Sequence, residues 1–151
     1  MTIKGSCCCG GVRFELFERP AMMGACHCSR CRKAGSSAYV YVRSEAFHWL
    51  AGRELLVRYQ PKPPMTFSRA FCRRCGTSLG DPDGTRVVAI AANCLDDDPG
   101  VRMDFHEYAP DKPPWYEICD DAKPYGVTSS RNEEKAAAEA TAFPGSAPEG
   151  A

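Results

Sequence analysis

The sequence contains few of the branched and aromatic side chains from which protein cores are usually built. Leu, Ile, Val and Phe supply only 24 of its 151 residues, and the resulting fraction of about 16 % is below the roughly 20 % under which disorder is suspected. Disorder also requires a high net charge, whereas 19 basic residues are balanced here by 19 acidic ones. The chain is therefore expected to fold, with something besides a large apolar core stabilising it.

Long apolar runs and an excess of one charge are also missing. No stretch approaches the ~18 apolar residues that a membrane span requires, and the N-terminal residues lack the apolar segment of a secretory signal. These absences predict a cytoplasmic protein with no membrane partner. Without a basic excess to neutralise phosphates, the composition also argues against a nucleic acid as the partner.

The pattern of residues 11–108 is typical of short β-strands separated by Gly, Pro and Asp. Alternating or β-branched and aromatic segments predict strands at residues 12–16, 39–43, 47–50, 55–59, 87–91 and 103–108. Only residues 29–34 are suited to a helical turn. Several short strands with turn signals between them predict an all-β domain.

The composition changes near residue 130, where an Ala-rich segment is followed by one rich in Pro and Gly. The Ala-rich part is shorter than the ~12 to 15 residues at which an isolated helix becomes marginally stable. The sequence therefore predicts a domain over residues 1–128 and a disordered tail over 129–151.

Cysteine is abundant, with ten residues, and eight of them fall into three clusters. In a reducing cytosol such residues are expected to be metal ligands or reactive thiols rather than disulfides. The clusters are Cys7-Cys8-Cys9, Cys26-His27-Cys28-Ser29-Arg30-Cys31 and Cys72-Arg73-Arg74-Cys75.

The spacing within each cluster directs sulfur atoms toward a common point. In an extended chain residues i and i+2 face the same side, so Cys7 and Cys9 can reach one metal ion while the cysteine between them points away. Cys72 and Cys75 have the C-x-x-C spacing of a turn around an ion, and Gly76 after them can adopt the positive φ that such a turn favours.

The cluster at residues 26–31 is contiguous enough to bind an ion by itself. Cys26 and Cys28 face one side and His27 the other, while a turn brings Cys31 onto the same ion. A structural zinc has four protein ligands, and a catalytic zinc has three and an open position. Seven thiols divide naturally into four and three, although spacing alone does not decide the pairing. The alternative is two closed sites, the second completed by Cys94, Cys119 or His27.

Three segments together resemble one protein family. Residues 5–14 (GSCCCGGVRF), 26–33 (CHCSRCRK) and 71–77 (FCRRCGT) are similar to the motifs of the glutathione-dependent formaldehyde-activating enzymes, a family that includes centromere protein V. The resemblance extends over roughly residues 3–126. It implies an all-β fold of several short, coiled antiparallel sheets, described as a β-tent and organised around zinc sites.

The resemblance also implies two zinc ions per chain. A structural zinc would be bound by Cys7, Cys9, Cys72 and Cys75, and a catalytic-type zinc by Cys26, Cys28 and Cys31. The implied activity is the condensation of glutathione with formaldehyde to S-hydroxymethylglutathione, which is carbon–sulfur lyase chemistry in reverse. The implied partners are a small-molecule thiol and a small electrophile.

Other polar residues are assigned by their position. Arg30, Arg32 and Lys33 flank Cys31 and are predicted to offset the negative charge of the thiolates and to bind the carboxylates of a glutathione-like ligand, the alternative being a solvated face. Arg73 and Arg74 are predicted to be exposed turn residues. Packing or supporting roles are expected for the remaining candidates, which are His27, His48, His106, Tyr39 and Tyr41. Cys8, Cys94 and Cys119 have no assigned role.

The leading hypothesis is a two-zinc lyase-type enzyme that adds a thiol to formaldehyde at an open three-cysteine site. A second is a non-catalytic zinc-binding interaction module, whose partner could use a local basic patch. A third is a thiol-dependent detoxification enzyme that acts on a different electrophile.

Overall fold

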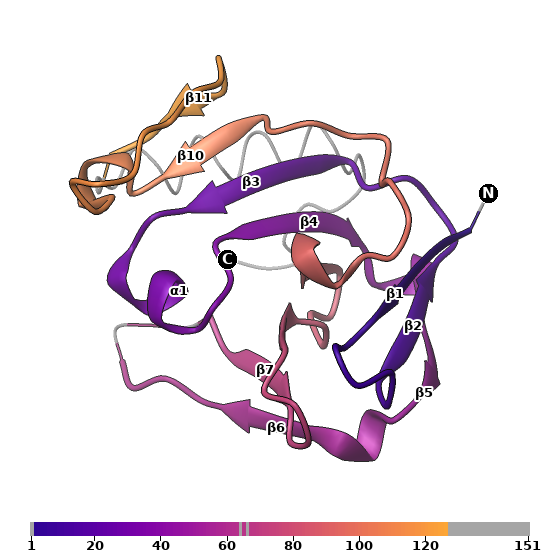
Figure 1. Ribbon diagram of the computed structural model, residues 1–151. Coiled ribbons are helices and arrows are strands. Elements are labelled where there is room, and N and C mark those ends of the chain that lie inside the picture. Colours follow the sequence, from indigo (N-terminus) through magenta and orange to yellow (C-terminus); the bar gives the residue numbers. More distant parts are fainter. Residues whose placement is uncertain (1, 64, 66, 127–151) are drawn as a thin grey trace, which may run out of the picture.

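The computed structural model describes residues 2–63, 65 and 67–126, which form two β-sheets and little helix (Figure 1). The smaller sheet has the order β1 (Ile3–Ser6), β2 (Arg13–Leu16), β5 (Phe47–Ala51). The larger has the order β11 (Lys123–Pro124), β10 (Phe105–Glu107), β3 (Met22–Cys26), β4 (Ala38–Arg43), β9 (Val87–Ala91), β8 (Ser78–Asp81), β7 (Arg69–Cys72), β6 (Leu56–Tyr59). The all-β prediction is confirmed.

Helical structure in the described residues is confined to single turns. The α-helix α1 spans Ser29–Lys33, close to the predicted turn. Four 3₁₀ turns occupy Ser44–Ala46, Arg53–Leu55, Ala92–Cys94 and Ala109–Asp111. None of these helices is long and apolar enough to cross a membrane. The predicted tail over 129–151 lies outside the described residues.

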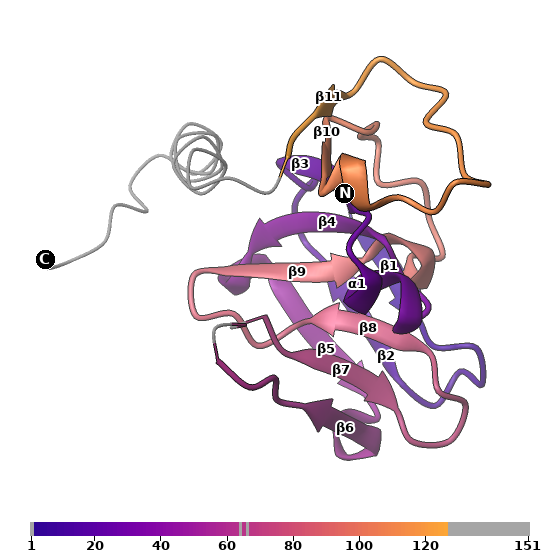
Figure 2. The same cartoon turned by 90° about the vertical axis from the view of Figure 1, so that its left-hand side faces the viewer.

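The two sheets are largely antiparallel, and Figure 2 shows β4, β9, β8, β7 and β6 following one another across the larger one. The exception is β10, which runs parallel to both β3 and β11. Its register places His106 opposite Ala25 and Glu107 opposite Cys26. A segment from the end of the domain therefore lies beside the strand that leads into the second cysteine cluster.

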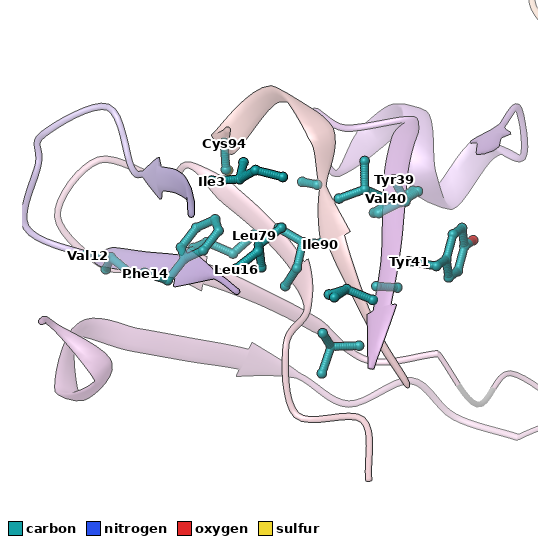
Figure 3. Packing of buried hydrophobic residues seen from close by; sticks show 14 of the residues in the cluster. Ile3, Val12, Phe14, Leu16, Tyr39, Val40, Tyr41, Leu79, Ile90 and Cys94 are labelled. Atoms are coloured by element: carbon teal, nitrogen blue, oxygen red, sulfur yellow. The ribbon is translucent and has the colours of Figure 1, made fainter. Parts of the chain in front are cut away.

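Strand β4 is buried on both faces and organises the core. Val40 and Val42 point to one face, and Tyr39 and Tyr41 point to the other, in agreement with the core role predicted for these tyrosines. Figure 3 shows Tyr41 on the opposite side of β4 from the main group of apolar side chains, which includes Phe14, Leu16, Leu79 and Ile90. Strand β4 thus contributes buried side chains on both of its faces.

Each predicted strand range contains a strand, but five strands were not predicted. They are β1, β3, β7, β8 and β11. The first four contain Gly, Ala, Ser, Met or Cys and few β-branched residues, and β11 consists of Lys and Pro only. Pairing with neighbours overrides the weak local preference; β3, for example, pairs with β4 over four residues.

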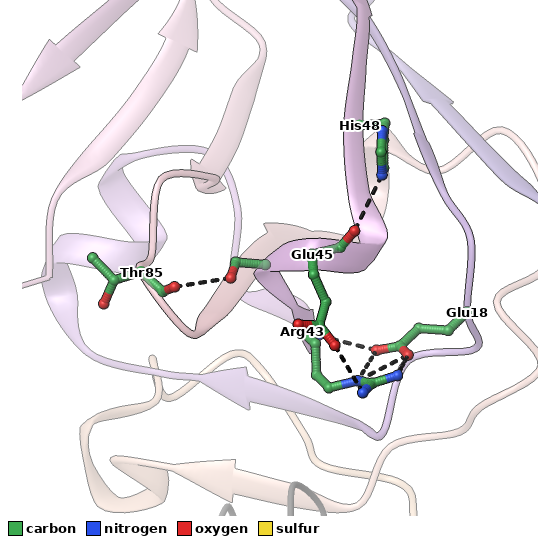
Figure 4. A network of polar contacts seen from close by, with 6 residues as sticks. Glu18, Arg43, Glu45, His48 and Thr85 are labelled. Atoms are coloured by element: carbon green, nitrogen blue, oxygen red, sulfur yellow. Dashed lines mark hydrogen bonds and ion pairs between the residues drawn. The ribbon is translucent and has the colours of Figure 1, made fainter. Parts of the chain in front are cut away.

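A polar network fastens the end of β4 to the loop after β2 (Figure 4). The Arg43 guanidinium donates hydrogen bonds to the Glu18 carboxylate, forms an ion pair with Glu45 at 2.9 Å, and holds the pKa of Glu18 below its usual range. The His48 ring bonds the Glu45 carbonyl at 3.1 Å and packs against Phe17, with ring centroids 4.5 Å apart. His48 therefore has a packing role.

We predict that Phe14→Ala lowers the free energy of unfolding by about 3 to 5 kcal/mol, because the ring is fully buried and packs against Phe47 and Trp49. Phe17→Ala is the matched control, because half of that residue is exposed. Its effect should stay within about 1 kcal/mol. Urea unfolding followed by circular dichroism measures both values, and equal losses would contradict this description of the core.

Candidate metal centres

Four cysteines from the two sheets meet at one point. Cys7 and Cys9 lie in the turn between β1 and β2, Cys72 ends β7, and Cys75 lies in the turn before β8. Their four Sγ atoms all lie within 4.8 Å of one another. The Cys7–Cys9 separation is 3.5 Å and the Cys9–Cys72 separation is 3.9 Å, close to the edge of about 3.8 Å of a tetrahedron of thiolates around zinc. This group could hold a metal ion.

Backbone geometry explains how the C-x-x-C turn forms. Gly76 has φ +74°, the left-handed conformation predicted for it, and its N–H donates to the Cys72 carbonyl at 2.8 Å. The Thr77 hydroxyl lies 3.2 Å from the Cys75 sulfur, and its hydrogen bond is the main cause that lowers the pKa of Cys75 to about 6. Cys75 is thus poised to be a thiolate, the form in which cysteine binds metals.

The second group is built within six residues. Cys26 ends β3, Cys28 is the N-cap of α1, and Cys31 lies inside that helix, so the turn of the helix folds the third sulfur back onto the first two. All three Sγ atoms lie within 4.8 Å of one another. Hydrogen bonds, first from the Cys26 thiol and then from the Cys31 thiol, hold the pKa of Cys28 far below its usual value. This group could also hold a metal ion.

None of the three candidates for a fourth ligand joins this second group in the described part of the chain. His27 is buried, and its Nε2 is 2.7 Å from Nδ1 of His106. The Cys94 thiol donates to the Ser78 carbonyl at 2.9 Å, and burial raises its pKa to about 12. Cys119 is exposed and bonds locally. The group therefore offers three candidate ligands among the described residues.

A chain of hydrogen bonds that the sequence did not predict runs from His27, beside the three-cysteine group, through His106 to Asp120. His27 contacts His106, and Nε2 of His106 lies 2.9 Å from Oδ1 of Asp120. The His27 N–H also donates to the Glu107 carbonyl at 2.8 Å. His27 points away from the sulfurs, as predicted, and burial is the main cause that lowers its pKa. A packing or supporting role was predicted for His106, but its partners His27 and Asp120 were not, because only the pairing of β10 with β3 brings these residues together.

The three cations predicted near Cys31 have different surroundings. Arg30 donates to the Phe67 carbonyl at 3.1 Å, and Arg32 donates to the His27 carbonyl at 3.3 Å. Arg30 and Lys33 line a cavity of about 520 Å³, whereas Arg32 is not among its lining residues. Other cations on its wall are Lys62 and Arg69, and none of the described residues that line it carries a carboxylate.

The guanidinium in direct contact with Cys31 comes from a strand rather than from the motif. Arg69, the first residue of β7, is buried, and its Nη2 lies 3.1 Å from the Cys31 sulfur. It was missed because nothing in the sequence places β7 beside α1. Arg73 and Arg74 are exposed, as predicted.

Comparison with known proteins agrees with this arrangement. Residues 2–116 match the model of the family described as "Glutathione-dependent formaldehyde-activating enzyme". The chain belongs to this family. A Halomonas elongata protein named "Putative glutathione-dependent formaldehyde-activating enzyme" is 35 % identical over 128 residues, which cover 78 % of this chain and 82 % of the relative.

A solved structure shares the fold. The crystal structure of a Rhodobacter sphaeroides protein superposes with a TM-score of 0.51 and 29 % identity, covering 62 % of this chain and 87 % of that one. Both cysteine groups and His106 lie inside the segment that matches the glutathione-dependent formaldehyde-activating enzyme family. Asp120 and β11 lie beyond it.

We predict that Asp120→Ala lowers the stability of the protein, because it leaves a buried histidine nitrogen of His106 without its acceptor. Asp121→Ala, at the adjacent exposed position, is the control and should be neutral. Urea unfolding measures the difference, and hydrogen exchange should be faster in β10 of the first variant only. Identical stability of the two variants would refute the supporting role of this chain.

We predict that Cys72→Ser abolishes metal binding by the four-cysteine group and unfolds the domain, because this group joins the two sheets. Cys8→Ser removes an exposed thiol outside the group and should leave metal content and fold unchanged. Metal analysis after gel filtration, together with circular dichroism, tests both variants. A folded Cys72→Ser protein with full metal content would overturn the assignment.

Proposed function

We propose that this protein binds two zinc ions and adds the thiol of glutathione to formaldehyde. Zinc at Cys7, Cys9, Cys72 and Cys75 would be structural. Zinc at the three-cysteine group would be catalytic. The observation that carries the proposal is the pairing of a four-sulfur group with a three-sulfur group in a chain of this family, because structural zinc is fully ligated by protein and catalytic zinc is not.

The donor chemistry favours zinc. Both groups consist only of cysteine sulfurs, and soft thiolate ligands in tetrahedral arrangement select zinc or iron–sulfur clusters over hard cations. Four sulfurs gathered from both sheets match a structural zinc site.

The reaction needs a thiolate and a route for one proton. The sulfur of glutathione forms a bond to the formaldehyde carbon, the π pair of the carbonyl moves to oxygen, and the proton lost by the thiol ends on that oxygen as a hydroxyl. Zinc with an open position supplies the deprotonation of a thiol that binds there. No oxidant or reductant is required.

The residues around the cavity have the charges that glutathione needs. Glutathione carries two carboxylates, and Arg30, Lys33 and Lys62 present positive charge on a wall whose described residues include no carboxylate. The cavity volume of about 520 Å³ lies within the ordinary range for small-molecule sites. We assign Arg30 and Lys33 to binding the carboxylates, whereas Arg32 orders the backbone at His27.

The central test is Cys31→Ser. We expect wild-type protein to contain two zinc ions and the variant one, and we expect the variant to lose acceleration of adduct formation. Exchange NMR with ¹³C-formaldehyde and glutathione measures the rate above the spontaneous reaction. Cys119→Ser, an exposed cysteine outside both groups, is the control and should retain two ions and full activity.

Each other outcome selects a different hypothesis. Two zinc ions with glutathione binding but no acceleration for formaldehyde would favour a thiol-dependent enzyme for another electrophile. A single tightly bound ion with no thiol binding would favour a non-catalytic zinc-binding interaction module.

The basic cavity gives a prediction of its own. Lys33→Ala should raise KM for glutathione roughly tenfold, the loss expected for one charge-assisted hydrogen bond, and should leave KM for cysteamine, which has no carboxylate, unchanged. Lys4→Ala, in β1 of the other sheet, is the matched control. Steady-state kinetics with both thiols decides, and an equal rise for both would argue against carboxylate binding at this wall.

A further inference from the structure

Arg69 is a buried cation without a carboxylate partner among the described residues. Only 6 % of its surface is exposed. Its polar contacts are the Cys31 sulfur at 3.1 Å and the Ser68 carbonyl at 3.3 Å, and its guanidinium lies 4.5 Å from the centre of the Phe67 ring. A buried charge is costly unless an opposite charge compensates it. The Cys31 sulfur of the three-cysteine group is the group in direct contact with it that could supply this charge, as a thiolate.

The charges balance when the group holds a divalent ion. Three thiolates and a divalent cation carry a net charge of −1, and the guanidinium brings the sum to zero. Binding of a fourth thiolate would then bring the net charge of the site to −1, instead of the −2 that it would have without the guanidinium. The desolvated contact between Nη2 and the sulfur makes this compensation stronger than that of the exposed cations on α1.

Arg69 also forms part of the wall of the basic cavity. The same side chain therefore separates the cavity from the cysteine group and contacts both. The Phe67 ring that Arg69 packs against is itself held by two neighbours. Phe67 packs its ring against Tyr39 with centroids 5.7 Å apart, and the Phe67 carbonyl accepts a hydrogen bond from Arg30.

We propose that Arg69 is a positioning residue that neutralises the three-cysteine group by an N–H···S hydrogen bond to Cys31 and thereby allows an anionic fourth ligand to enter from the cavity. This inference rests on the proposed function only in taking that ligand to be a thiolate. The contribution of Arg69 to metal binding is independent of formaldehyde. Arg32 and Lys33, the exposed cations predicted from the motif, are secondary in this role.

The test uses Arg69→Met and Arg69→Lys in the full chain, with Arg73→Met, an exposed arginine of the next turn, as the matched control. Each protein is loaded with Zn²⁺, and a chromophoric chelator competes for it. We expect Arg69→Met to bind the second ion roughly tenfold to a hundredfold more weakly, as is typical when a group hydrogen-bonded to a metal ligand is lost. The first ion should be unaffected, and Cys31→Ser provides the one-ion reference.

Loading with Co²⁺ provides a second readout that a merely structural role would not move. Loss of a hydrogen bond to a coordinated sulfur should shift the sulfur-to-cobalt charge-transfer band of the second site to lower energy in Arg69→Met. Arg69→Lys keeps the charge and should recover part of the affinity. Circular dichroism and retention of the first ion establish that each variant is folded.

The outcomes are separable. If Arg69→Met binds the second ion as wild type does and its band is unshifted, the proposal is overturned. It is also overturned if Arg69→Lys is no better than Arg69→Met, because charge would then not matter. If these effects appear but no variant, wild type included, accelerates adduct formation, the proposed reaction fails while the role of Arg69 stands.

Discussion

The four-sulfur contact between the two sheets is the constraint on which the rest of the structure depends. Cys7 and Cys9 belong to the turn of the three-stranded sheet, and Cys72 and Cys75 belong to a hairpin of the larger one. The buried apolar side chains form a single cluster, in which small residues such as alanine and cysteine replace many of the large aliphatic ones. Ligation by four thiolates would therefore supply stability that a larger apolar core provides in other domains of this size.

Strand β7 connects the two cysteine groups. Its last residue, Cys72, belongs to the four-sulfur group, and its first residue, Arg69, contacts Cys31 of the other. Only two residues separate them, and a β-strand is stiff over so short a distance. Proper assembly of the four-sulfur group therefore also fixes the position of the cation at the three-sulfur group.

The sequence predicted what is local and missed what depends on pairing. The contiguous group of Cys26, Cys28 and Cys31, the positive φ of Gly76 and the orientation of His27 away from the sulfurs follow from spacing and backbone geometry. The grouping of the other four cysteines also needed the ligand count and the family resemblance, because spacing alone does not decide the pairing. Arg69, His106 and Asp120 reach the site only because β7, β10 and the segment after it lie beside α1 and β3. A contact between residues 79 positions apart has no local signature.

The two cysteine groups differ sharply in how much chain must be closed to form them. The three-sulfur group spans six residues, whereas the Cys9–Cys72 contact joins residues 63 positions apart. The entropy cost of closing a loop rises with the length of chain enclosed. The three-sulfur group can therefore assemble during synthesis as soon as α1 emerges, whereas the four-sulfur group forms only after the β7–β8 hairpin. Metal loading would thus follow the direction of translation. The thiols of the three-sulfur group would be bound to their ion before the rest of the domain has folded.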